Sequence, residues 1–301
     1  SIDTLNKGCS LSSTFLTNQN QFSLFKGNPF VYWINKDLAF KLSKNKTLEP
    51  DLANIRVGLQ TGDDFRFLRL WWEVNNEDII SPLSLDEDSD MVRKKYLLEV
   101  SNNDSCWCYY SKIDKAAIFY APIHLVVQWG NNGRQIKSYH EGNGHSASKY
   151  VMSESRYFMP GFSYMFRSSR LIPYIVPKGV IPAASRSQIY PHVGLENEVL
   201  ITISSNIASA VARFRGENFG QPKFQNSMME GIPYTELSNR DKSIVLDRIN
   251  DLYEEAEQQY ENDETSINYI GAAIDAKYKT KKIDRQSLIG KYSENLIAKN
   301  Y

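Results

Sequence analysis

The most informative segment of the chain, Gly58–Val74, reads Gly-Leu-Gln-Thr-Gly-Asp-Asp-Phe-Arg-Phe-Leu-Arg-Leu-Trp-Trp-Glu-Val. Thr61-Gly62-Asp63 predicts a polar turn, because glycine supplies a permissive backbone position. Large apolar side chains follow at once, interleaved with Arg66 and Arg69. The segment therefore predicts a tight turn that presents two guanidinium groups from an aromatic platform.

These two arginines admit two roles. One is contact with a phosphate, and the other is a buried partnership with Asp63, Asp64 or Glu73. A cation beside the Trp71-Trp72 pair is often stacked or paired. We therefore expect a structural role for at least one of the two.

The segment also carries a family resemblance. Together with Tyr32-Trp33-Ile34, it resembles the region after the catalytic domain of large adenine-specific DNA methyltransferases of the type IIG restriction-modification and BREX phage-exclusion kinds. Those proteins have a Tyr-Trp element, then Gly-Leu-x-Thr-Gly-Asp-Asn-x-x-Phe-x-Arg and a Trp-x-Glu-Val strand. Asp64 stands here where they usually carry asparagine.

The resemblance continues downstream in the same order and covers roughly residues 30 to 235. Its members are Trp107 with Tyr109 and Tyr110, Val126 to Gly133 with Ile136-Lys137, Tyr157 to Tyr164, Ser168-Ser169, and Pro177 to Ile181. Tyr164 takes the place of the usual tryptophan in the Gly-x-x-Trp-x-x-x-Ser-Ser element, so the DNA target sequence is not predicted.

The resemblance implies a target recognition region that reads duplex DNA for a methyltransferase. The expected fold class is α+β, with a largely antiparallel β recognition domain, inserted helices and a helical C-terminal appendage. The expected organisation is a connector at 1–30, the recognition domain at 31–235 and the appendage at 236–301. The chain begins with Ser1 and is expected to be part of a longer protein, whose upstream methyltransferase domain is its partner.

Charge is segregated along a chain that is neutral overall, with 35 acidic and 35 basic residues. Glu73 to Asp104 holds nine acidic residues against three basic, whereas Cys106 to His192 holds ten basic against three acidic. Aromatic residues lie among those cations, a mixture suited to phosphate contacts beside base or sugar packing. The basic block is predicted to face DNA, although a solvated basic face is the alternative.

The predicted DNA-binding residues are those suited to phosphate contact or base readout. The best candidate is the stretch from Tyr157 through Arg170. The full set is Arg66, Arg69, Asn131, Asn132, Lys137, Lys149, Arg156, Tyr157, Ser163, Tyr164, Arg167, Ser168, Arg170, Lys178, Arg186 and Gln188.

Catalytic patterns are not predicted in this chain. Adenine methylation needs a glycine-rich turn for S-adenosylmethionine and an Asn-Pro-Pro-Tyr type loop, but Asn28-Pro29-Phe30 lacks the second proline. No Gly-x-Ser-x-Gly string is present. His140 and His145 flank Glu141 in a glycine-rich stretch that favours a solvated loop. No cofactor is expected in this fragment, and S-adenosylmethionine belongs to the parent enzyme.

The three cysteines are too few for a disulfide framework, so an intracellular, cytoplasmic setting is expected. Cys106 and Cys108 should point to one side of a strand, and no histidine pair completes a zinc site. The apolar-leaning run Ala116–Trp129 is too short to span a membrane.

Several local elements are predicted. Asp37 to Lys44 has the spacing of a short helix, and Leu195 to Arg213 that of one longer helix. Ile118–Tyr120, Leu125–Trp129 and Leu171–Val176 read as strands, and Asn132-Gly133 as a hairpin turn. Ser238 begins a helix with Val245, Ile249, Leu252, Ala256 and Tyr260 on one face, and two more helical stretches follow. Eight acidic residues between Asp247 and Glu264 make DNA contact there unexpected.

The function expected from these patterns is sequence-specific duplex DNA recognition, with no catalysis by this fragment. An assembly module that docks on a methyltransferase or phage-defence partner without reading bases is the alternative, favoured by the neutral net charge. A stand-alone module for carbohydrate or single-stranded nucleic acid is a third reading.

Overall fold

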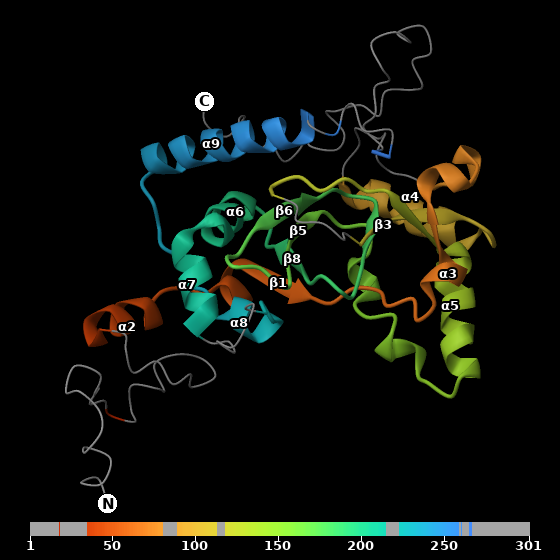
Figure 1. The fold of residues 1–301 in the computed structure, drawn as a ribbon, viewed down its shortest axis with the longest axis horizontal. Coiled ribbons are helices and arrows are strands. Elements are labelled where there is room, and N and C mark those ends of the chain that lie inside the picture. The colour runs from red at the N-terminus through yellow and green to blue at the C-terminus, as the bar shows by residue number, and fades with distance from the viewer. Residues whose placement is uncertain are drawn as a thin grey trace, which may run out of the picture.

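The chain folds into two four-stranded sheets with helices around them, as the computed structural model shows (Figure 1). The structure describes residues 35–80, 89–112, 118–214 and 223–258, together with residues 18, 260, 265 and 266. Within these residues helices and strands are interspersed, and all but one pair of neighbouring strands run antiparallel. The predicted α+β class is confirmed.

The first sheet is antiparallel throughout and has the strand order β1-β8-β5-β6. Its strands are β1 (Ala53–Arg56), β8 (Gln188–Pro191), β5 (Gly161–Tyr164) and β6 (Pro173–Val176). Ile55 and Phe162 both pair with Ile189, and all three side chains are buried in one core with the neighbouring helices.

The second sheet has the order β2-β4-β3-β7 and contains the one parallel pair, β3 with β7. Its strands are β2 (Leu68–Leu70), β4 (Leu125–Gln128), β3 (Trp107–Ser111) and β7 (Val180–Pro182). Val127 pairs with Leu68 on one side and Cys108 on the other, and all three are buried.

Two chain segments cross between the sheets and bond to each other. Residues 57–59 lead from β1 toward the second sheet, and residues 183–187 lead from β7 back to β8. The amide of Leu59 donates to the carbonyl of Pro182 over 2.7 Å, and the amide of Ala184 donates to the carbonyl of Leu59 over 2.7 Å. Only glycine fits at position 58, since a Cβ there would lie 2.0 Å from the Pro182 oxygen.

Helices surround the two sheets in separate groups (Figure 1). Near the first sheet lie α2 (Lys36–Ser43), α6 (Glu196–Ser204), α7 (Asn206–Phe214), α8 (Asn226–Glu230) and α9 (Asn239–Gln258). Near the second lie α3 (Asp64–Phe67), α4 (Ser89–Ser101) and α5 (Gly130–Gly142). The short helical turns are Leu48–Leu52, Trp71–Glu73, Asn76–Asp78, Ala147–Lys149 and Glu154–Arg156.

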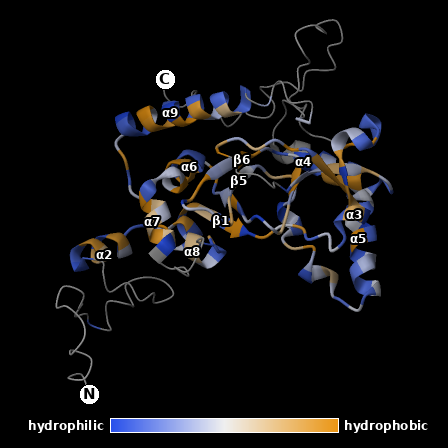
Figure 2. Ribbon diagram, in the orientation of Figure 1, coloured by the Kyte–Doolittle hydropathy of each residue, from blue (hydrophilic) through white to orange (hydrophobic). Residues whose placement is uncertain are grey.

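The predicted helices at the two ends of the described chain are present. Asn35 caps α2 through its side chain, which accepts from the amide of Asp37 over 2.8 Å. Ser238 caps α9 by accepting from the amide of Asp241 over 3.2 Å. The buried face of α9 consists of Leu246, Ile249, Tyr253 and Glu257, so it is rotated from the predicted face, and hydrophobic and hydrophilic residues alternate along this helix (Figure 2).

The single helix predicted from Leu195 to Arg213 is wrong, because the chain forms α6 and α7 with a break at Ser205. The Ser205 hydroxyl accepts from the amide of Ala208 over 3.0 Å and donates to the carbonyl of Thr202 over 2.8 Å. A serine that bonds the backbone locally favours a helix start over a helix interior.

The hairpin predicted at Asn132-Gly133 is also wrong. Asn131, Asn132 and Gly133 do have positive φ, but they open the helix α5. A Cβ at Gly133 would lie 2.3 Å from the Trp129 ring, so the turn folds tightly beneath that ring. Ile136 and His140, four residues apart, are buried, and that spacing favours a helix.

Two strand predictions need correction as well. Trp71–Glu73 is a helical turn after the short strand β2, not the Trp-x-Glu-Val strand that the resemblance implied. Ile118–Tyr120 forms isolated bridges only.

Some predictions lie outside the described residues. They are nearly all of the 1–30 connector, the Tyr32-Trp33-Ile34 element, and the helical stretches after residue 266. Among the helices that the structure describes, none combines the length and apolarity needed to cross a membrane.

Candidate nucleic-acid interface

Residues 165–171, in the connection between β5 and β6, are called the basic loop here. The carbonyl of Phe166 accepts from the amide of Phe224 over 2.8 Å, and the amide of Leu171 donates to the Ser209 hydroxyl over 3.0 Å. These bonds hold the loop at both ends through the backbone and through α7. The loop is therefore a fixed platform for the side chains between its anchors.

Arg167 and Arg170 project from this platform and are exposed. Within the described part of the chain neither makes an ion pair with a carboxylate. Both guanidinium groups are therefore available for phosphate or base-edge contacts. A guanidinium group suits such contacts because it carries five N–H donors and a permanent positive charge. Ser168 lies between them and is half-buried.

Two further cations lie next to the basic loop, and sequence reasoning missed both. Lys223 bridges Arg167 through the backbone. Arg213 is exposed and lies one helical turn after Ser209, the residue that anchors Leu171. No local sequence pattern predicts that Arg213 and Lys223 lie near the loop. Their positions depend on how α7 and the segment before α8 pack. Arg167, Arg170, Arg213 and Lys223 are called the loop patch.

Four predicted DNA-binding residues lie in the interior. Tyr157, Ser163, Tyr164 and Gln188 are each at most 2% exposed. The Ser163 hydroxyl donates to the carbonyl of Ser187 over 2.8 Å, and the Gln188 amide donates to the carbonyl of Met159 over 3.2 Å. Burial raises the pKa of Tyr157 and of Tyr164, so both phenols are neutral. This burial removes the four residues from any surface that contacts DNA.

The candidates around α5 are partly engaged within the protein. Lys137 pairs with Glu154 over 2.7 Å and lies 5.8 Å from the centre of the Trp129 ring. The Asn131 side chain donates to the Asp104 carboxylate. Asn132 is half-buried and Lys149 is exposed. The structure therefore leaves Asn132 and Lys149 as the more available members of this group.

The remaining basic candidates are half-buried. The Arg156 guanidinium lies 5.9 Å from the centre of the Tyr190 ring. Lys178 sits in the turn between β6 and β7, and Arg186 in the segment that crosses from β7 to β8. The three come from different elements, and they are not part of the loop patch as defined.

Arg66 and Arg69 have structural contacts, but not the acidic partners that were expected. Arg69 donates to the carbonyls of Phe65 and Leu68 over 2.7 and 2.6 Å and lies 5.9 Å from the centre of the Trp107 ring. The Arg66 guanidinium is exposed and lies 5.2 and 5.3 Å from the centres of the rings of Phe67 and Tyr139. Both guanidinium groups lie over aromatic rings, and the expected carboxylates have other partners.

The carboxylate of Asp64 pairs with Lys112 and accepts from the Thr61 hydroxyl over 2.5 Å. Burial alone raises the pKa of Asp64, but the hydrogen bonds from Lys112 and Thr61 and the Lys112 charge lower it overall. Asp63 caps α3 by accepting from the amide of Arg66 over 3.1 Å. These contacts fix the turn at residues 61–64.

His140 is wrongly predicted as a solvated loop residue. It is 2% exposed, its Nε2 lies 3.0 Å from the carbonyl oxygen of Thr61, and its ring stacks on Tyr150 at 3.6 Å. It lies on α5, which holds it against the Thr61 turn. His145, by contrast, is exposed, so the two histidines differ in burial.

Cys106 and Cys108 do lie on one side of the chain, inside the core of the second sheet. Burial raises the pKa of Cys108, so its thiol is neutral. In the part of the chain that the structure describes, no three histidine, cysteine or carboxylate side chains are close enough to hold a metal ion.

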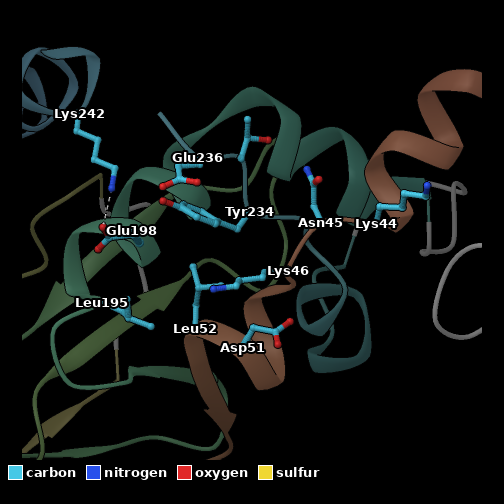
Figure 3. A pocket seen from close by; sticks show the side chains of 11 residues that line it. Lys44, Asn45, Lys46, Asp51, Leu52, Leu195, Glu198, Tyr234, Glu236 and Lys242 are labelled. Carbon is cyan, nitrogen blue, oxygen red and sulfur yellow. Dashed lines mark hydrogen bonds and ion pairs between the residues drawn. The ribbon is translucent and has the colours of Figure 1, made fainter. Parts of the chain in front are cut away.

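A polar hollow of about 500 Å³ separates the start of α9 from the end of α2. Its lining holds three lysines (Lys44, Lys46 and Lys242) and three carboxylates (Asp51, Glu198 and Glu236). Figure 3 shows Tyr234 and Glu236 near the 2.9 Å ion pair of Lys242 with Glu198. The charges balance, and the ion pair joins α9 to α6.

Comparison with known proteins shows that part of the chain is similar to part of an adenine-specific methyltransferase. No protein-family model matches it. The chain is 25% identical over 128 residues to the adenine-specific methyltransferase PglX of Lacticaseibacillus casei (strain Zhang); the match covers 42% of this chain and 10% of that protein. The chain thus spans about a tenth of this curated relative. Part of it is related to part of an adenine-specific methyltransferase.

A solved structure, the type IIL restriction-modification enzyme MmeI in complex with DNA, aligns with 82% of this chain and 33% of its own. The identity is 12% and the TM-score is 0.47. That likeness is too weak to support an argument about function.

Proposed function

We propose that this chain recognises a specific duplex DNA sequence as the specificity region of a larger adenine-N6 DNA methyltransferase of the restriction-modification or phage-exclusion kind. In this proposal residues 31–235 are the recognition domain and residues 236–301 a helical appendage. The upstream methyltransferase domain binds S-adenosylmethionine and carries out the transfer. The chain itself binds no cofactor and catalyses nothing.

The observation that carries the proposal is the loop patch. Its cations come from three separate parts of the sequence and meet at a loop that the backbone holds in place. Neither loop arginine has a carboxylate partner among the described residues, although most other basic candidates are paired, stacked or half-buried. Unpaired guanidinium groups on a fixed loop are suited to phosphate contact and to bidentate readout of guanine.

The proposed contact set is narrower than the one expected from sequence. Arg167, Arg170 and Ser168 form its centre, with Arg213 and Lys223 beside them. Lys149, Asn132, Arg156, Lys178 and Arg186 remain as outer contacts, whereas Arg66 stacks on the rings of Phe67 and Tyr139. Arg69, Asn131 and Lys137 act mainly within the fold, and the four buried residues are not among the proposed contacts.

The test is a titration of labelled duplex DNA with the 301-residue chain across a salt series from 50 to 200 mM. A pool with a randomised central segment serves as DNA, and selection from it tests sequence preference. Each phosphate contact contributes about −0.9 to the slope of log K against log salt. The double variant Arg167→Glu with Arg170→Glu should therefore make this negative slope shallower by about 1.8. It should also show no preference for any sequence in the randomised pool.

The matched control is Arg240→Glu with Arg248→Glu, which makes the same change in net charge on α9. Both residues are exposed, and binding should be little altered. If wild-type chain does not bind at 50 mM salt, or if the two double variants weaken binding equally, direct recognition by the loop patch is wrong.

A second candidate is an assembly module that docks on a methyltransferase or phage-defence partner without reading bases. The equal numbers of acidic and basic residues favour it, since no overall field attracts DNA. Under this candidate the loop-patch reversal leaves partner docking intact.

A further inference from the structure

Phe65 is the most exposed aromatic side chain among the described residues, at 95%. Phe67, two residues later, is fully buried. Between the crossing segment and β2, the turn is fixed by three contacts: Thr61 with Asp64, Asp63 with the amide of Arg66, and His140 with the carbonyl of Thr61. Phe65 is therefore held out into solvent by a well-braced turn.

A second aromatic ring is exposed on the same segment. Trp72 is 43% exposed and packs edge to face on Trp71, with ring centres 5.6 Å apart. Exposed large aromatics on a fixed scaffold are costly in water and are enriched where proteins associate. The span of residues 61–72 is called the aromatic turn.

The charges of the aromatic turn are already used within the protein. Asp64 pairs with Lys112, Arg69 binds two backbone carbonyls, and Glu73, next to the turn, accepts from the amide of Leu70 over 2.8 Å. Duplex DNA attracts free cations, and among the described residues Arg66 is the charged side chain of this turn for which no polar partner is found. The aromatic turn thus suits a protein surface better than a phosphate backbone, in contrast to the loop patch.

A hollow of about 740 Å³ opens beside Phe65. Its lining combines aromatic rings with hydroxyls, including Tyr110, Tyr139, Thr61 and Ser185. A projecting ring next to a hollow matches the anatomy of protein interfaces, where an anchor on one partner fills a pocket on the other.

We infer that the aromatic turn is the surface on which the methyltransferase domain of the same protein packs, with Phe65 as its main anchor. This inference rests on the proposed function, which supplies that domain. It is supported by the match to a methyltransferase of which this chain spans 10%. Contacts between domains of one chain commonly bury about 600 to 1,500 Å². The exposed rings of Phe65 and Trp72 and the hollow beside Phe65 would form part of such an interface.

The experiment compares amide hydrogen exchange in the 301-residue chain and in the complete methyltransferase polypeptide, each with and without duplex DNA. Residues 61–72 should become more protected in the complete polypeptide before any DNA is added. Phe65→Ser with Trp72→Gln should reverse the gain, because truncating an interface anchor shifts the docking equilibrium by roughly tenfold or more. Val193→Ser, at a fully exposed site, is the control and should change nothing.

Three results separate the possibilities. Protection that appears only with DNA overturns the inference and assigns the aromatic turn to nucleic acid. No protection in any condition overturns it as well. Failure of the isolated chain to bind DNA, with protection still present in the complete polypeptide, refutes the proposed function and leaves the docking surface in place.

Discussion

The substitution Gly58→Ala tests the crossing between the two sheets. An added Cβ would lie 2.0 Å from the Pro182 oxygen and 2.5 Å from its carbonyl carbon. Both atoms are backbone, so no side chain can turn away. The crossing segments must separate by roughly 1 Å or more to reach an ordinary contact distance.

The cost follows from what that separation breaks. The two hydrogen bonds that join Leu59 to Pro182 and Ala184 weaken, at about 1 kcal/mol each. Overpacking adds about 1–3 kcal/mol. The free energy of unfolding should therefore fall by about 3–5 kcal/mol, a large part of the roughly 5–15 kcal/mol of a typical domain.

Urea unfolding followed by tryptophan fluorescence and by circular dichroism measures this change. The matched control is Gly142→Ala at the end of α5, where an added Cβ meets nothing within 4 Å. That variant should be unchanged or up to about 1 kcal/mol more stable, because alanine favours helix over glycine. A loss below about 1 kcal/mol for Gly58→Ala would refute the view that the crossing is tightly packed.

Three further predictions concern single side chains. Tyr164→Phe should leave DNA binding unchanged and cost about 1 kcal/mol of stability, since its buried hydroxyl donates a long hydrogen bond of 3.4 Å to the Asn226 side chain. Lys242→Met should destabilise the protein by about 1 kcal/mol at neutral pH. The hydrogen bond that Lys242 donates to Glu198 raises the pKa of Lys242, so this stabilisation is complete below pH 10.5 and is lost as pH rises through the folded-state pKa. Asp64→Asn should flatten the acid side of the stability profile, because the lowered pKa of Asp64 gives a stabilisation that is present above pH 3.8 and lost as pH falls through the folded-state pKa.

Each of these has a contrary outcome. A tenfold loss of affinity in Tyr164→Phe would mean that the phenol reaches DNA. For Lys242 the control is Arg248→Met, whose 3.5 Å pair with Asp251 is largely exposed and should contribute nothing measurable; equal effects would show that the hollow does not strengthen the ion pair. An unaltered acid limb in Asp64→Asn would show that Lys112 does not stabilise the folded carboxylate.

Local sequence patterns correctly predicted helices whose formation depends on residues adjacent in the chain. The helices beginning after Asn35 and Ser238 form where a polar cap precedes an amphipathic run. The break at Ser205 was missed, although Ser204-Ser205-Asn206 carries the local signal, because apolar spacing continued across it.

Other errors came from contacts distant in sequence. Asn132-Gly133 has the positive φ that a hairpin turn needs, yet the Trp129 ring and the backbone of Asn103 determine where the chain goes next. His140 was placed in solvent from the glycines that follow it, whereas Thr61, 79 residues earlier, holds it in the interior.

The composition of the sequence indicated the stretch that holds the exposed loop arginines, but it did not indicate which residues of that stretch are exposed. The basic, aromatic stretch from Tyr157 to Arg170 does contain the exposed loop arginines, but all four residues of β5 are buried. Both faces of β5 are buried, so alternation gave no way to separate Ser163 and Tyr164 from the loop. Arg213 and Lys223 join the site only through the packing of α7 and the segment that precedes α8.

The anchoring of the basic loop bears on which of its residues can be replaced. Phe166 is held through its carbonyl and Leu171 through its amide, so neither bond depends on which side chains occupy positions 167–170. Replacement of those four residues leaves the anchors intact and alters only the groups presented to a ligand. Substitutions at these four positions, whether natural or made in a library, can therefore change the side chains that the loop presents while the anchoring hydrogen bonds stay in place.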